Sequence, residues 1–363
     1  MEATTTYELS LVKEYVSRWG MKEAVRELIQ NALDSASPFV YEFITEDHQS
    51  FGLRLNSEFT TLSPQTLLLG ATSKADDKDA IGSFGEGYKI ALLVLTRLGY
   101  EVGVLNGDKL WRPRFRFNRR FGCEVLVIDE TQLPNKVNNG LTFQVEGLSK
   151  DDVAEVVASC LRMQDDIGAI KQTTMGDILL DRPKELYVGG LFICKTDMEF
   201  GYNVKPEHLR LERDRQTVSG WELAALTCNM WYETKDYSRI ADLIAQECPD
   251  LEYAKYDSPD MVKEACYQHF REKHPGSVIA KTDTELKALV ARGMTVYVGG
   301  GGYHAAVTGS RSYKAENHAV HRVEQPHEAL TLWLSANRKA MRGSAIESFR
   351  KVLIEEKSPT WKA

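Results

Sequence analysis

A glycine-rich stretch that runs directly into a long apolar segment is the feature that most constrains the fold. Residues 81–95 read IGSFGEGYKIALLVL, with Gly82, Gly85 and Gly87 placed just before Lys89. Glycine lets the backbone approach an anion closely, and the amides at a helix start point toward that anion. The stretch therefore predicts a loop, then a helix, with a phosphate group as the ligand. Glycine loops also form ordinary turns, so this prediction depends on the rest of the chain.

A second segment supplies polar groups of the kind that phosphate chemistry needs. Residues 21–37 predict a helix. Asn31 and Asp34 follow Glu27 by four and seven residues, so the three side chains share one face of that helix. The amide oxygen of Asn31 suits a hard cation such as Mg²⁺. The carboxylate of Glu27, one turn earlier, can hold a water molecule and accept its proton. The alternative is a polar face that only contacts solvent.

The remaining pattern of residues 1–148 predicts antiparallel strands around these helices. A short amphipathic helix is expected at 11–20. Strands are expected at 39–46, 51–56, 100–106, 110–118, 123–130 and 141–148. This order is an α+β layer rather than a regular βαβ alternation.

The rest of the chain predicts two further units, for three domains at 1–148, 149–248 and 249–363. In the second, a helix at 151–163, a hairpin at 184–195 and a long helix at 221–247 are expected. The third reads as a smaller α/β unit with helices at 259–273, 282–293 and 345–356 and a strand at 294–300.

Composition excludes several classes of protein. The formal net charge of −7 argues against a general nucleic-acid binder. None of the six cysteines forms a CxxC pair, so neither a zinc site nor a disulfide framework is expected. No apolar run reaches about 18 residues and the start lacks signal-peptide character, so we expect a cytoplasmic protein without a membrane span.

Three segments in order resemble a known superfamily. ELIQNALD at 27–34, IGSFGEGYK at 81–89 and a Gly-x-Thr strand at 140–142 are similar to the motifs of the GHKL superfamily. Its members include gyrase B subunits, the ninety-kilodalton heat-shock chaperone, MutL, MORC proteins and sensor kinases. The resemblance covers about 20–145. It implies a Bergerat fold, in which helices cover an antiparallel sheet, with ATP and Mg²⁺ as cofactors.

The resemblance also implies roles for individual residues. Glu27 matches the water-activating base, Asn31 the magnesium ligand and Asp34 the last acidic position of the helix motif. Thr142 matches a threonine near the base of the nucleotide. The remaining matches, in the phosphate-binding loop and the mobile lid, are Gly82, Gly85, Gly87, Lys89 and Lys74.

One departure from the family pattern is serious. The family's Asp-x-Gly-x-Gly box should follow the strand FGLRL, but the sequence there is NSEFT, 56–60, and the adenine-reading aspartate is replaced by Asn56. An asparagine can accept the adenine amino hydrogen, but it can also donate a hydrogen bond. This change leaves base selectivity open. It favours an alternative in which the chain is a catalytically inactive nucleotide-sensing or scaffold protein.

Two groups of arginines have competing interpretations. Arg213 and Arg215 match the place where a transducer-like second domain of the family sends a basic side chain to the terminal phosphate. Their alternative is a salt-bridged surface turn. Arg112, Arg114 and Arg116 alternate along a predicted strand. They predict either a nucleic-acid face, as in a DNA-processing accessory protein, or a solvated outer face.

The expected function is therefore a slow, magnesium-dependent ATPase. By analogy with the family, closing of the lid and dimerisation would make the chain a nucleotide-driven switch that acts on a protein partner.

Overall fold

The computed structural model describes residues 4–35, 37–45, 50–68, 86–134, 140–209, 220–317, 333 and 341–356. It divides the chain into two compact units, Met1–Asp257 and Ser258–Ala363. Each unit is described by itself. The first holds two separate sheets, so the predicted boundary at 148/149 remains a prediction.

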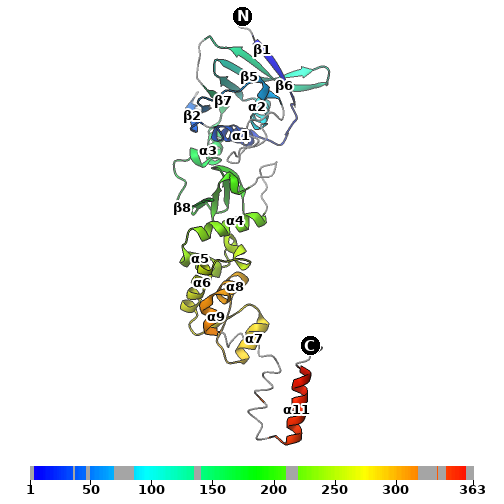
Figure 1. Cartoon of the computed structure of the whole chain (residues 1–363). Helices are drawn as coiled ribbons and strands as arrows, with labels where there is room; N and C mark the ends of the chain where they lie inside the picture. The colour runs from blue at the N-terminus through cyan, green and yellow to red at the C-terminus, as the bar shows by residue number, and fades with distance from the viewer. Residues whose placement is uncertain are drawn as a thin grey trace. The chain divides into compact units, whose positions relative to one another are not determined.

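A seven-stranded antiparallel sheet forms the N-terminal part of the first unit (Figure 1). Its order is β1-β6-β5-β4-β7-β3-β2. The strands are β1 (Thr4–Val12), β2 (Val40–Thr45), β3 (Phe51–Ser57), β4 (Glu101–Asn106), β5 (Lys109–Asn118), β6 (Cys123–Gln132) and β7 (Leu141–Leu148). Six of the seven were expected from alternating or continuous apolar patterns, and these predictions are confirmed.

Two helices cover one face of this sheet. They are α1 (Met21–Leu33) and α2 (Gly87–Leu98), and their apolar residues share one buried cluster with those of the strands. The Tyr88 ring of α2 lies 6.1 Å from the Phe143 ring of β7. A large antiparallel sheet with helices on it confirms the mixed α+β class.

The sheet's two faces carry different side chains, because successive residues of a strand point to opposite sides. The helix face carries Leu53 and Leu55 of β3 and Phe143 of β7, all in the buried cluster. The outer face is therefore the side of Asn56 and Thr142, which alternate with these core residues. The two residues are direct partners in the β3–β7 ladder.

The rest of the first unit contains α3 (Lys150–Ala158), α4 (Gly220–Glu233) and α5 (Tyr237–Ala245) with a second sheet. Its order is β11-β10-β12-β9-β8. The strands are β8 (Ile170–Thr173), β9 (Gly176–Leu179), β10 (Glu185–Val188), β11 (Leu191–Lys195) and β12 (Gly201–Val204). The 3₁₀ segments of the whole first unit are η1 (Pro64–Leu67), η2 (Leu161–Met163), η3 (Pro206–His208) and the kinked η4 (Pro249–Lys255). The expected hairpin is confirmed as β10–β11.

A buried carboxylate holds this part together. Asp250 is fully buried and accepts hydrogen bonds from the backbone amides of Glu199 and Phe200, at 2.6 and 3.1 Å. It also accepts one from the Tyr202 hydroxyl. A buried charge requires this kind of satisfaction, so Asp250 links η4 to β12.

The second unit contains helices around a parallel pair of strands. The pair is β13 (Val278–Ala280) and β14 (Val296–Val298). The helices are α6 (Asp260–Lys273), α7 (Asp283–Ala291), α8 (Gly301–Gly309), α9 (Arg311–Asn317) and α11 (Gly343–Glu356).

Two expected helices are wrong in detail. Residues 11–20 form the end of β1 and a series of turns, which Arg97 of α2 holds through hydrogen bonds to the carbonyls of Lys13, Tyr15, Val16 and Trp19. The segment 221–247 breaks between α4 and α5, where Lys235 has a φ of +55° and Asp236 caps α5. Among the helices of the described residues, none is long and apolar enough to cross a membrane.

Candidate functional site

Glu27 places a carboxylate in the interior of the sandwich. It lies in the second turn of α1 and is 1% exposed. The Arg26 guanidinium, also buried, lies 3.9 Å from one carboxylate oxygen. A buried carboxylate is costly unless other groups compensate its charge. The buried Arg26 guanidinium compensates part of this charge, and the sequence thereby keeps a carboxylate in the interior.

The start of α2 meets this carboxylate. A methyl group built at Gly87 would lie 2.2 Å from Oε2 of Glu27 and 3.7 Å from Nδ2 of Asn31. Any side chain at 87 would require the Glu27 carboxylate to move. The glycine segment and the α1 motif, fifty residues apart in sequence, are thus in contact. The side chain of the N-cap residue, Glu86, makes no capping hydrogen bond to α2. The amides of this first turn carry the positive end of the helix dipole.

Asn31 is oriented by the helix that carries it. Its Nδ2 donates a hydrogen bond of 2.7 Å to the Glu27 carbonyl. The amide oxygen, the atom that a hard cation would use, is thereby directed away from that carbonyl. Asp34, the last residue of the predicted motif, is the C-cap of α1.

The few oxygen ligands in this arrangement suit Mg²⁺, which also takes water and phosphate ligands, better than a metal ion that is coordinated only by protein side chains. Within the described parts of the chain, no three His, Cys, Asp or Glu side chains gather to hold a metal ion. Mg²⁺ commonly uses one or two protein ligands together with water and substrate phosphates. The residues present, Glu27, Asn31 and the glycine at 87, are compatible with that group.

Lys89 has a different place from the one its motif suggested. It is fully buried, its ammonium group donates to the carbonyl of Leu68, and it lies 5.7 Å from the Tyr88 ring centre. Burial lowers the pKa of Lys89, and the carboxylate of Glu86 partly opposes this. Lys89 thus ties α2 to the residue that follows η1.

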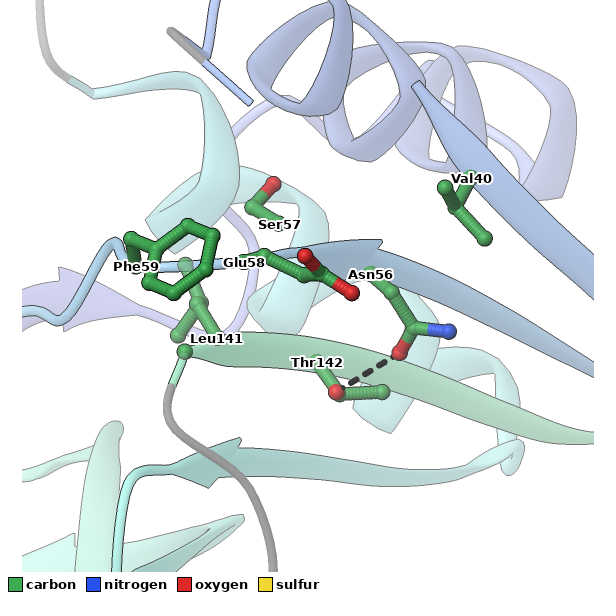
Figure 2. A pocket seen from close by; sticks show the side chains of 8 residues that line it. Val40, Asn56, Ser57, Glu58, Phe59, Leu141 and Thr142 are labelled. Atoms are coloured by element: carbon green, nitrogen blue, oxygen red, sulfur yellow. Dashed lines mark hydrogen bonds between the residues drawn. The ribbon is translucent and has the colours of Figure 1, made fainter. Parts of the chain in front are cut away.

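Asn56 and Thr142 meet each other, but not Glu27. The Thr142 hydroxyl donates a hydrogen bond of 2.7 Å to Oδ1 of Asn56 (Figure 2). Both line a pocket of about 470 Å³ at the end of β3. Since both lie on the outer face, the sheet separates them from Glu27 and Asn31 on α1. The structure therefore divides the predicted nucleotide residues between two sides of the sheet.

Ser57 is the polar residue that sequence reasoning missed on the helix face. It follows Leu53 and Leu55 at a spacing of two and is buried, as they are. The Gly140 backbone packs against it, because a methyl group there would lie 2.1 Å from the Ser57 carbonyl oxygen. The alternation Leu53-x-Leu55-x-Ser57 was the signal that could have placed it.

Five predicted site residues lie outside the described part of the chain. They are Lys74, Gly82, Gly85, Arg213 and Arg215. Their roles remain predictions from the sequence.

The arginine row of β5 carries its own counter-charges. Arg112 lies 3.7 Å from Glu101, Arg114 lies 2.5 Å from Asp129, and Arg116 lies 2.6 Å from Glu8. The hydrogen bond from Arg114 lowers the pKa of Asp129, and the one from Arg116 lowers that of Glu8. These pairs favour the solvated outer face over the nucleic-acid surface.

Comparison with known proteins adds a relative but no function. No protein-family model matches the chain. A curated protein of Mycoplasma pneumoniae, described as uncharacterized, is 24% identical over 226 residues, which cover 57% of this chain and 89% of that protein. Most of that shorter protein thus corresponds to a little over half of this chain.

Proposed function

We propose that the N-terminal sandwich, residues 4–148, is a nucleotide-binding unit of the GHKL type that takes ATP with Mg²⁺. The observation that carries the proposal is the contact between Glu27 and Gly87. It joins the two motifs on which the resemblance depends, at a buried carboxylate next to a helix start. The close approach of the Gly87 backbone to the Glu27 carboxylate supports a specific binding site rather than a polar face that only contacts solvent.

The residues have distinct roles in this proposal. Bound Mg²⁺ would neutralise charge on the phosphates. Asn31 would hold the cation through its amide oxygen, and Glu27 would orient a water molecule and accept its proton. The amides at the start of α2 would face the phosphates. Hydrolysis would be slow, and the chain would act as a switch on a protein partner or a second copy of itself.

The base would be read by different residues from those first expected. Phosphates that contact Glu27 and Gly87 lie on the helix face, so the base must lie on that face too. Ser57 faces this side, whereas Asn56 and Thr142 face away. A serine offers one hydroxyl where the family has a carboxylate. This supports the second candidate function, a nucleotide-sensing or scaffold protein with little or no turnover.

Variants on the two faces test the proposal. We expect Glu27→Gln to keep ATP binding and to lower turnover by about 10²-fold or more. Asn31→Ala should lose the dependence of affinity on Mg²⁺, with affinity falling about tenfold. Binding is measured by calorimetry and turnover by phosphate release.

Outer-face variants are the matched controls. Asn56→Ala and Thr142→Val should leave the ATP affinity unchanged. Loss of ATP binding in these two, with normal binding in Asn31→Ala, would place the nucleotide on the outer face and refute the assignment.

A further inference from the structure

The outer-face pocket lies at the end of β3 and is lined by Val40, Asn56, Ser57, Glu58, Phe59, Gly140, Leu141 and Thr142. Of these residues, Ser57 alone is assigned to the proposed nucleotide site. The volume of the pocket is about 470 Å³, within the range of ligand pockets. It opens beside β2, the edge strand of the sheet, where Val40 is exposed. The side chains of Glu58, Phe59 and Asn56, which carry the proposal below, take no part in the proposed nucleotide site.

Phe59 is held in an unfavourable conformation that presents its ring to solvent. Its φ is +61° and its side chain is 82% exposed. Bulky residues rarely adopt the left-handed region, and exposure of a phenyl ring adds a further cost. Residues in such conformations cluster at functional sites, where surrounding structure enforces them. The Gly140 backbone packs closely against Ser57 and Glu58, the two residues before Phe59.

Among the polar side chains that line the pocket, the Glu58 carboxylate only accepts hydrogen bonds. Figure 2 shows the Glu58 carboxylate pointing from the end of β3 toward the Asn56 amide. Oδ1 of Asn56 already accepts from Thr142 and has a second lone pair. The arginine of the same strand, Arg54, pairs instead with Glu42, at 3.8 Å. A carboxylate beside a carbonyl-type oxygen and an exposed ring suits a flat, positively charged donor.

We propose that the outer-face pocket binds the guanidinium group of an arginine side chain, carried by a peptide segment of a protein partner. The guanidinium would stack on the Phe59 ring and donate two parallel hydrogen bonds to the Glu58 carboxylate. A lysine ammonium cannot form this flat, paired contact. The pocket is larger than a single guanidinium group. The edge strand β2 beside it leaves space for the backbone of the peptide that carries the arginine.

The experiment uses the full chain and a fluorescent glycine-serine peptide with one central arginine, with binding followed by anisotropy at low salt. The arginine peptide should bind several-fold more tightly than its lysine counterpart. Glu58→Gln should weaken binding about tenfold. The control Glu42→Gln removes a carboxylate from the neighbouring strand and should leave the affinity unchanged.

Phe59→Gly separates function from folding. Glycine accepts the positive φ without strain, so this variant should be at least as stable as the wild type while the peptide affinity falls several-fold. The proposal is overturned if neither peptide binds, or if the lysine peptide binds as tightly as the arginine peptide. It is also overturned if Glu42→Gln weakens binding as much as Glu58→Gln does, or if the pocket prefers adenosine to the arginine peptide. Glu27→Gln should not change peptide binding, so failure here is distinct from failure of the nucleotide site.

Discussion

At the scale of single residues, the contact between Gly87 and Glu27 has the sharpest consequence. A methyl group at 87 would lie 2.2 Å from the Glu27 carboxylate, closer than any non-bonded contact allows. The carboxylate or the start of α2 must then move. The interior around both is packed, with Ala24 and Leu28 fully buried beside Glu27, so the displacement has little space to relax into.

Gly87→Ala should therefore destabilise the protein by about 1–3 kcal/mol, as overpacking does. The measurement is the free energy of unfolding from urea titration. Gly103→Ala is the control, because its methyl group would meet its neighbours at 3.6 Å, an ordinary contact. Glu27→Ala removes the carboxylate that the new methyl group would meet. Adding Gly87→Ala to a chain that carries Glu27→Ala should therefore lower the free energy of unfolding by less than Gly87→Ala does in the wild type. If Gly87→Ala is as mild as Gly103→Ala, the close contact does not exist in solution.

At the scale of elements, α2 is fixed to the turn η1 by two neighbouring side chains. Tyr88 donates a hydrogen bond of 2.9 Å to the Thr66 carbonyl, and Lys89 donates to the carbonyl of Leu68. Burial raises the pKa of Tyr88 to about 12, although the hydrogen bond to Thr66 lowers it slightly. The two bonds hold the start of α2 against η1 and the residue after it.

The raised pKa of Tyr88 predicts loss of stability at alkaline pH. In the unfolded chain a tyrosine loses its proton near pH 10, whereas folded Tyr88 keeps it to about pH 12. The contribution is complete below pH 10 and falls by about 1.4 kcal/mol per pH unit from about pH 10 to 12. Tyr88→Phe should make the fall of the unfolding free energy with pH shallower by the equivalent of about one proton. The measurement is a set of urea unfolding curves recorded at several pH values between about 9 and 11.5. The control Tyr15→Phe, at an exposed tyrosine, should keep the wild-type slope; an unchanged slope in Tyr88→Phe would contradict the prediction.

Most elements of the first sheet could be predicted from the sequence, because their side-chain periodicity is long enough to be clear. Strands such as β5, with ten residues, give a strong signal, whereas β8 and β13, with four and three, give almost none. The helix expected at 11–20 is wrong because Leu9 and Leu11 continue the alternation of a strand, so β1 runs to Val12 and turns follow it. The break at Lys235 depends on a backbone conformation that no local pattern signals.

The candidate site was predicted in part. Helix spacing predicted that Glu27 and Asn31 share one face of α1. The structure places the glycine at 87 against that face. The face of Asn56 was assigned by matching a motif, and the alternation with Leu53 and Leu55 shows the other side of the strand. A shift of one residue in a strand exchanges the two faces of the sheet, so Ser57 was overlooked.

At the scale of the whole molecule, the chain forms two compact units, and the boundary predicted at 148/149 lies inside the first of them. The proposed nucleotide site and the outer-face pocket both belong to the first unit, and Ser57 at the end of β3 adjoins both. The sheet would then hold one ligand on each face.

The central claim is that the helix face binds ATP with Mg²⁺, and calorimetric titration of the full chain tests it most directly. ATP, GTP and a non-hydrolysable ATP analogue are titrated with and without Mg²⁺. The account predicts one ATP per chain, with a dissociation constant on the order of micromolar that weakens when Mg²⁺ is removed. Binding of GTP alone would contradict the choice of base. No binding of any nucleotide, or binding that ignores Mg²⁺, would contradict the claim itself.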